Sequence, residues 1–314
     1  MNNNLTKKFG AIRRQFPVAD KSSGITYLNA ASTGPLCKPV KAALVDFYNK
    51  CWYQNQNNDI PAFAALDNIR KIGAKMIGAR AAEVGFGFST GFGLNVAAYG
   101  LPLKRGDEVL LSDIEFPANV YPWVGLKVRG IKVKFIKSID RKFDIDNFKK
   151  AISKKSRVLS LSFVQFFNGY KNDLKTIGEI CKDHGLYFVV DGIQGCGAEP
   201  IDVDKCKIDI FSAGAQKWML SPQGAGFFFV RKDLQNGLQM PWMSWLSVEW
   251  GLQFGDLFHY DKEPFDSARK FEMGTYPYSH VHAMSEALNL IDSVGVKNIQ
   301  QHNHELIDIL IEYI

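Results

Sequence analysis

Two residues whose types suit catalysis, Asp191 and Lys217, stand at related points of the chain. Asp191 follows an apolar run, 186–190, that is typical of a buried strand, and it leads into the glycine-rich segment GIQGCG. Lys217 comes 26 residues later (217 − 191), beyond another apolar run, and the segment SPQGAG follows it closely. A lysine that is removed from water can lose its proton and act as an amine nucleophile. A buried carboxylate, in turn, needs a cationic partner.

Pyridoxal phosphate would satisfy both residues, because its aldehyde forms a Schiff base with a lysine and its ring nitrogen pairs with an acid. Each residue taken alone has an ordinary alternative: Asp191 could cap a turn, and Lys217 could extend into solvent. Such short matches are common by chance. The order of strand, acid, strand, lysine and glycine-rich turn favours the cofactor over the two separate alternatives.

Apolar runs and amphipathic stretches alternate from about residue 84 onward. One helix between two runs is well marked, with Asp173 as its N-cap and Gly185 at its end. The alternation predicts an α/β domain, in which ligands bind beyond the carboxyl ends of the strands. The runs are rich in Val, Ile, Leu and Phe, as in strands buried on both faces of a parallel sheet. The predicted strands are 108–112, 131–136, 157–163, 186–190, 208–211 and 226–231.

The pattern changes after residue 240. Residues 241–261 contain six aromatic side chains and few helix or strand signals, so we expect a long aromatic loop. Helical periodicity returns at Tyr278, and a second helical pattern runs from Val296 to the end of the sequence.

Length and composition describe an ordinary globular protein. The chain has 314 residues, of which 46% are hydrophobic and 22% charged, and its basic and acidic residues differ by 38 − 32 = +6. The basic excess is spread along the chain and does not indicate nucleic-acid binding, and no apolar run approaches the ~20 residues that a membrane span needs. The five cysteines form no CxxC pair, which is typical of free thiols in a reducing compartment, so we expect a cytoplasmic protein. The spacing of the histidines does not indicate a metal site.

Six segments form a series that covers most of residues 26–290. They are YLNAASTGPL (27–36), STGFGLN (89–95), GDEVLLSDIEFPANVYPW (106–123), VQFFNG (164–169), the stretch 189–226 and FEMGT (271–275). In these segments and their order, the sequence resembles the class V aminotransferase family of fold-type I pyridoxal-phosphate enzymes. That family includes cysteine desulfurases and isopenicillin-N-epimerase-like proteins. The resemblance implies an α/β large domain with a mainly parallel seven-stranded sheet flanked by helices.

The resemblance also implies roles around the cofactor ring. Lys217 would carry the Schiff base, Asp191 would pair with the pyridine nitrogen, and Gln194 would reach the ring hydroxyl. Phe116 stands where the family stacks a ring, often a histidine, on the cofactor, and an ordinary core phenylalanine is an equal alternative. Gln165 would lie near the ring, although a surface amide is nearly as common.

Other residues are implied for the cofactor phosphate. Ser89, Thr90 and Gly91 lie between a predicted strand and a helix that we expect to begin near Leu94, and a helix N-terminus favours an anion. A plain helix cap is the alternative for these residues. Thr275 would reach the phosphate bound by a partner subunit, which implies a homodimer, and its alternative is a turn threonine.

The sequence departs from the family pattern next to the lysine. Many relatives have Ser-x-His before the lysine, whereas this chain has Gly-Ala-Gln. The phosphate would therefore lose a hydroxyl and an imidazole ligand, and Gln216 would substitute in part. Cys196 and Cys206 do not match the nucleophilic cysteine of the desulfurases, so we expect them to be buried apolar thiols.

The domain layout that the resemblance implies has three parts. They are an N-terminal arm (1–25), a cofactor-binding large domain (26–265) and the start of a C-terminal small domain (266–314), which we expect to be truncated. The expected activity is pyridoxal-phosphate chemistry on an amino acid, by transamination or an epimerase-like reaction. The alternatives are a cysteine desulfurase or lyase, and a truncated cofactor-binding remnant without catalysis that serves as a dimerisation partner.

Overall fold

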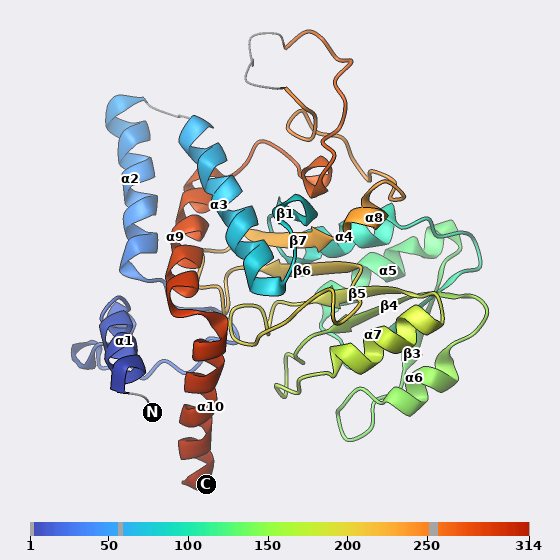
Figure 1. Cartoon of the computed structure of the whole chain (residues 1–314), viewed down its shortest axis with the longest axis horizontal. Helices are drawn as coiled ribbons and strands as arrows, with labels where there is room; N and C mark the ends of the chain where they lie inside the picture. Colours follow the sequence, from blue (N-terminus) through green and yellow to red (C-terminus); the bar gives the residue numbers. More distant parts are fainter. Residues whose placement is uncertain (1–2, 56–58, 251–256, 314) are drawn as a thin grey trace.

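The computed structural model describes residues 3–55, 59–250 and 257–313, and it shows a seven-stranded sheet flanked by helices (Figure 1). The strand order is β1-β7-β6-β5-β4-β2-β3. Only β7 is reversed, since it runs antiparallel to both of its neighbours, β1 and β6. The predicted α/β fold with a mainly parallel sheet is therefore confirmed. The strands are β1 (Val84–Gly87), β2 (Glu108–Ser112), β3 (Lys132–Ile136), β4 (Ser156–Ser162), β5 (Tyr187–Asp191), β6 (Ile210–Gly214) and β7 (Gly226–Val230).

The helices form two groups, one packed on the sheet and one beside its β1 edge (Figure 1). Helices α2, α3 and α9 lie side by side in the second group, and α10 follows α9 after Gly295. Among the described residues, no helix is both long and apolar enough to cross a membrane. The α-helices are α1 (Asn3–Arg13), α2 (Lys38–Gln54), α3 (Asp59–Ile77), α4 (Thr90–Gly100), α5 (Tyr121–Gly125), α6 (Ile145–Ala151), α7 (Leu174–Asp183), α8 (Lys232–Gln235), α9 (Tyr278–Val294) and α10 (Val296–Glu312).

The central strands are buried on both faces, as their apolar runs predict. In β7, Phe227 and Phe229 belong to the core that includes side chains of α3, α7 and α9. Phe228 and Val230 of the same strand face the other way, into the core formed with α4 and α5. Each such side chain contributes roughly 1.5–3 kcal/mol when it is removed from water, so β7 joins the two cores.

Most of the predicted elements are present. Asp173 caps α7 through Oδ1, which accepts the backbone N–H of Thr176 at 3.2 Å. Helices begin at Tyr278 and Val296, as their periodicity predicts. Of the predicted aromatic loop, residues 241–250 and 257–261 contain no helix or strand, and residues 251–256 lie outside the described part of the chain. The predicted division into arm, large domain and small domain stays a prediction.

Helix α4 begins at Thr90 and not near Leu94. Two early glycines, Gly91 and Gly93, weaken the helical signal because glycine costs about 1 kcal/mol in a helix. Packing explains the second glycine: a Cβ at Gly93 would lie 2.5 Å from Oγ of Ser212 in β6. Close contact between helix and sheet therefore outweighs helix propensity here.

Strand β6 begins and ends later than its apolar run predicts, at 210–214 instead of 208–211. Its last residues are small and do not extend the apolar pattern. They nevertheless stay in register, with Ser212 opposite Phe228 and Gly214 opposite Gly226. Backbone pairing with β7 decides the end of this strand.

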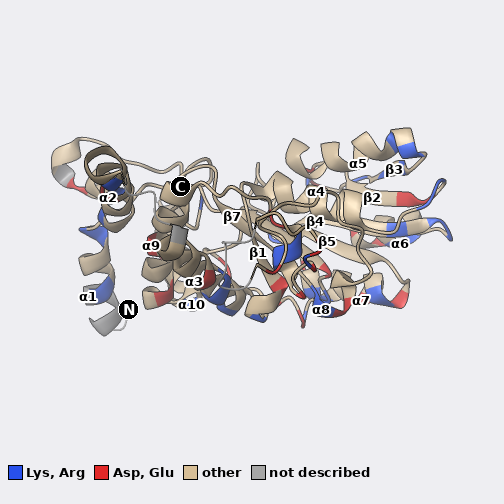
Figure 2. Cartoon of the chain, turned by 90° about the horizontal axis from the view of Figure 1, so that it is seen from above, with Lys and Arg blue, Asp and Glu red and all other residues tan. Residues whose placement is uncertain are grey.

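Figure 2 shows basic and acidic positions interspersed along the ribbon of the chain. The net charge of +6 is thus distributed in space as it is along the sequence.

A buried ion pair joins α3 to the segment before α9. Arg70 donates to Glu272 through Nε at 3.0 Å and Nη2 at 2.8 Å. Glu272 also accepts the backbone N–H of Phe86 in β1, at 2.9 Å, and the hydroxyl of Tyr276. A buried carboxylate is tolerated when its charge is paired and its oxygens are hydrogen-bonded, and both conditions are met.

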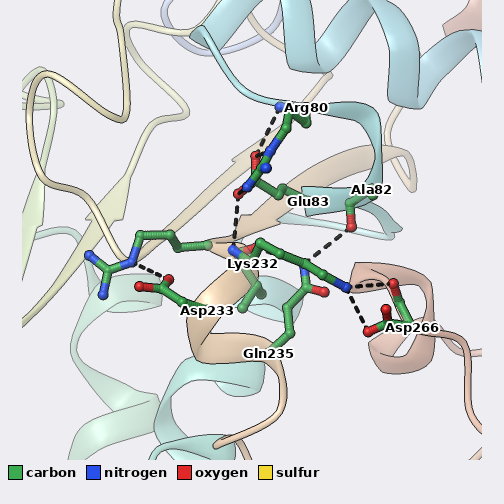
Figure 3. A network of polar contacts seen from close by, with 9 residues as sticks. Arg80, Ala82, Glu83, Lys232, Asp233, Gln235 and Asp266 are labelled. Carbon is green, nitrogen blue, oxygen red and sulfur yellow. Dashed lines mark hydrogen bonds and ion pairs between the residues drawn. The ribbon is translucent and has the colours of Figure 1, made fainter.

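A second buried carboxylate, Glu83, joins the start of β1 to the start of α8 (Figure 3). It accepts the backbone N–H groups of Arg80 at 3.0 Å and Lys232 at 2.9 Å, and it pairs with the Arg80 guanidinium. Because β1 and β5 run in the same direction, Glu83 lies at the opposite edge of the sheet from Asp191.

Removal of Arg70 should strongly destabilise the fold. The change Arg70→Ala leaves the Glu272 carboxylate buried without its cation, so we expect the free energy of unfolding to fall by about 3–5 kcal/mol. Urea denaturation followed by circular dichroism measures the change. The control is Lys50→Ala, which breaks an exposed pair with Asp46 and should cost less than about 0.5 kcal/mol. Equal losses in the two variants would contradict the assigned role.

Candidate active site

The sequence-predicted residues gather at one edge of the sheet because the strands before them run in the same direction. Thr90 follows β1, Gln165 follows β4, Asp191 ends β5 and Lys217 follows β6. This edge holds the carboxyl ends of the parallel strands, which is where α/β sheets bind ligands.

Asp191 is a buried acid at the end of β5. Its Oδ1 accepts the backbone N–H of Ile193 at 3.0 Å. Burial raises the pKa of Asp191 to about 7. The negative charge of Glu115 also raises this pKa, whereas the hydrogen bond from Ile193 and the positive charge of Lys217 lower it. The carboxyl is thus poised to hold a proton or to pair with a cation.

Lys217 lies half-buried beside this acid. Burial lowers its pKa, and the negative charge of Asp191 acts in the opposite direction. Its Nζ lies 5.7 Å from the ring centre of Phe116. Phe116 is 41% exposed, so it is not a core side chain. An amine, an acid and an open aromatic face therefore meet at one point.

The aromatic surface extends outward from Phe116. Phe166 meets the Phe116 ring edge-on, with 5.1 Å between ring centres, and Phe167 meets Phe166 edge-on at 5.4 Å. All three rings are partly exposed, so they border the lysine with apolar surface.

The N-terminal segment fixes the loop that carries the lysine. The backbone N–H of Gly34 donates to the backbone oxygen of Gln216 at 2.8 Å. A Cβ at Gly34 would lie 2.0 Å from the backbone oxygen of Lys217, so only glycine fits. The close approach of the two backbones is enough to require glycine at this position.

Gln194 bridges the same two segments. Its Nε2 donates to the backbone oxygen of Ala31 at 3.0 Å, and its Oε1 accepts the indole N–H of Trp218, also at 3.0 Å. An amide nitrogen carries two hydrogens, so Gln194 retains one donor. Its predicted bond to the ring hydroxyl stays a prediction.

The predicted phosphate residues meet at the N-terminus of α4. Ser89 is the N-cap residue and is exposed, and Gly91 follows in the first turn. Oγ1 of Thr90 accepts the backbone N–H of Gly214 at 2.9 Å, and Oε1 of Gln216 lies against Gly214. The helix N-terminus and these side chains form a polar surface suited to an anion.

Two predicted residues have other surroundings. Gln165 is only 1% exposed, so the surface alternative does not hold, and its Nε2 donates to Glu115 at 3.0 Å. Thr275 is exposed, and its neighbours Glu272 and Tyr276 belong to the cluster around Arg70. Whether Thr275 reaches a partner subunit stays a prediction.

Glu115 is a buried acid that the sequence reasoning missed as a site residue. It lies three residues after β2, at the same sheet edge as Asp191. The sequence contains a signal for this residue, because Glu115 is an acid that follows a predicted buried strand and directly precedes Phe116.

These residues fit pyridoxal phosphate. Asp191 is buried, and its hydrogen bond comes from a neutral backbone group, so a protonated ring nitrogen would supply a matching charge. Lys217 would bind the aldehyde, the open face of Phe116 would cover the ring, and the α4 N-terminus would hold the phosphate. Cys196 is buried and burial raises the pKa of its thiol to about 12, so it does not add a nucleophile.

The fold and this site define a pyridoxal-phosphate enzyme of the fold-type I class. The family model for class V aminotransferases matches residues 26–314. The chain belongs to the class V aminotransferase family, as its sequence motifs indicate.

Curated relatives agree with this family. The chain is similar to "Uncharacterized aminotransferase YcbU" of Bacillus subtilis, with 30% identity over 88% of this chain and 72% of the relative. It is 27% identical to a "Probable cysteine desulfurase" of Methanothermobacter thermautotrophicus, over 94% of this chain and 73% of the relative. The chain therefore spans about three quarters of the length of these relatives.

Solved structures share the fold. The apo cysteine desulfurase from Thermococcus onnurineus superposes with a TM-score of 0.82 and 24% identity, over 96% of this chain and 75% of that one. The cystine C-S lyase C-DES, in complex with cysteine persulfide, gives 0.77 and 21%, over 86% and 72%.

The pKa of Asp191 predicts a pH-dependent stability for the cofactor-free chain. Because the folded state keeps the proton up to about pH 7 while the unfolded state releases it near pH 4, stability should fall as the pH rises between these values. Asp191→Asn should remove this fall and gain a few kcal/mol at pH 8, at about 1.4 kcal/mol for each pKa unit.

Urea denaturation of both proteins at several pH values measures this difference. Asp209, whose pKa burial raises to about 6, contributes a fall of the same sign in both proteins, so it cancels in the comparison. Parallel stability curves for the two proteins between pH 4 and pH 8 would refute the prediction.

Proposed function

We propose that this class V enzyme acts on an amino acid through pyridoxal phosphate bound to Lys217, by transamination or an epimerase-like reaction. The observation that carries the proposal is the meeting of Lys217, buried Asp191 and the open ring of Phe116 at the carboxyl edge of the sheet. When bound, the cofactor supplies an electron sink for a carbanion formed on the substrate.

Each of the three residues has a separate task in the proposal. Burial lowers the pKa of Lys217, so its amine can take the proton from the substrate Cα and return it. Asp191 holds the ring nitrogen in its protonated form. Phe116 fixes the plane of the ring, and because phenylalanine has no titratable group, it transfers no proton.

A second candidate is a cysteine desulfurase or lyase, which the printed names of several relatives favour. Of these two reactions, the desulfurase reaction transfers sulfur to the enzyme and therefore needs a nucleophilic thiol. Of the two cysteines that follow Asp191, Cys196 is buried and Cys206 is half-buried, and burial raises the pKa of both thiols. Neither of these two thiols is suited to sulfur transfer, so the first candidate is preferred over a desulfurase whose nucleophile would be Cys196 or Cys206.

The proposal extends to assembly and location. Thr275, exposed before α9, would contact the phosphate in the site of a second subunit, so the active form would be a homodimer. We propose the cytoplasm as its location, because the five cysteines form no CxxC pair, which is typical of a reducing compartment.

The lysine is tested by absorption spectroscopy. Pyridoxal phosphate added to the purified protein should give a visible band that Lys217→Ala abolishes, because the band requires the covalent bond to the amine. Lys50→Ala, which removes an exposed lysine of α2, is the matched control and should keep the band. A wild-type protein that gains no such band would refute the proposal.

The reaction is tested with a panel of amino acids. We expect exchange of the Cα hydrogen in deuterated water, reduced roughly 10²–10⁴-fold by loss of the lysine base, and no sulfide from cysteine. Sulfide release would favour the desulfurase candidate. A visible band that no amino acid alters would favour the non-catalytic remnant.

A further inference from the structure

Glu115 lies at the centre of a buried polar cluster behind the site. Its Oε2 accepts Nδ2 of Asn119 at 2.8 Å and Oγ of Ser162 at 2.5 Å. Its Oε1 accepts the backbone N–H of Ser162 at 3.1 Å and Nε2 of Gln165 at 3.0 Å. Asn119 is held in turn by Oγ of Ser160 at 2.5 Å. Both carboxyl oxygens therefore have two partners each.

The cluster is built to hold a carboxylate. Three of the four partners are N–H groups, which can only donate, and an ionised carboxyl only accepts. Burial raises the pKa of Glu115, and the hydrogen bonds from Asn119, Ser162 and Gln165 oppose this rise. No Lys or Arg is among its hydrogen-bond partners, which distinguishes Glu115 from Glu272.

The cluster reaches Asp191 through one residue. Ser162 ends β4 and pairs with Asp191 of β5, so the two side chains point to the same face of the sheet. The charge of Glu115 acts on Asp191 directly. On the other side of Asp191, the paired residue in β6 is Ser212, which carries no charge.

Among the described residues, the negative charge at this edge is compensated only in part. The charge of Glu115 adds to the negative charge at Asp191, and the one amine that acts on Asp191, that of Lys217, has its charged form disfavoured by burial. A protonated ring nitrogen would restore the balance. In addition, Oε1 of Gln165 is buried without a hydrogen-bond partner among the described residues, so the cluster also lacks one donor.

We propose that Glu115 is a positioning residue of the cofactor site, whose negative charge keeps the proton on the ring nitrogen that pairs with Asp191. This inference rests on the proposed function, because it assumes pyridoxal phosphate at Lys217. Glu115 acts through Asp191 and does not itself contact the cofactor.

The test is the pH midpoint at which the visible band of the bound cofactor changes. In Glu115→Gln one negative charge is lost, so cationic forms in the site are less stable and the midpoint should fall by about one pH unit. Glu115→Met removes the same charge without adding N–H donors, and it should lower the midpoint in the same direction.

Two controls separate charge from structure. Glu115→Asp keeps the charge and should keep the midpoint close to that of the wild type. Glu83→Gln neutralises a buried carboxylate at the opposite edge of the sheet and should leave the midpoint unchanged (Figure 3). Melting temperatures of the cofactor-free variants report any loss of folding.

An unchanged midpoint in a neutral variant that binds the cofactor would overturn the inference. Loss of cofactor binding in both neutral variants, with binding retained in Glu115→Asp and Glu83→Gln, would support it. Loss in Glu115→Asp as well would show a purely structural role and overturn it. If the wild-type protein itself gives no lysine-dependent band, the proposed function fails, and that result is distinct from all of these.

Discussion

The site depends on a carboxylate that the protein buries without a full counter-charge. Asp191 ends the central strand β5, between β4 and β6, and is removed from water by the sheet and the segments around it. A charge in such a place must be paired, protonated or neutralised by a ligand. The half-buried amine of Lys217 compensates the negative charge of Asp191 only in part. This partly compensated negative charge lies among the other features of the edge, which are the open ring of Phe116, the amide side chains and the N-terminus of α4.

The buried acids of this protein fall into two kinds. Glu272 and Glu83 are each paired with an arginine and with backbone N–H groups, and they hold helices to the sheet. Asp209 is of the same kind, since it pairs with Arg231 and accepts the backbone N–H of Phe188. Asp191 and Glu115 have hydrogen bonds but no arginine. Pairing makes a buried carboxylate a structural element, whereas an incompletely compensated one stores electrostatic free energy that a cation can release. Within the described part of the chain, the second kind lies where the strand ends converge on Lys217.

The sequence predicted the fold class and the central pair, because apolar runs, acids after strands and glycine-rich turns are local signals. Asp191 and Lys217 both follow strands that end at this edge, and their charges act on each other, while their roles toward the cofactor stay a prediction. The environment of Gln165 depends on Glu115, a residue 50 positions away, and no local pattern reports such a contact. The start of α4 was misplaced because Gly93 is selected by packing on Ser212 and not by propensity. Roles that need a second chain or a bound molecule, such as that of Thr275, lie beyond what one chain can show.

The contact between Gly34 and the lysine loop bears on when the site can form. Their backbone hydrogen bond joins positions 34 and 216, so the first is synthesised long before the second. Contacts between distant positions form late, since the chain between them must first be ordered. During synthesis on the ribosome, the N-terminal segment therefore cannot form this hydrogen bond until the chain has been made through β6 and the residues that follow it. We therefore expect the cofactor to bind late in synthesis, because a nascent chain that ends before this loop lacks Lys217.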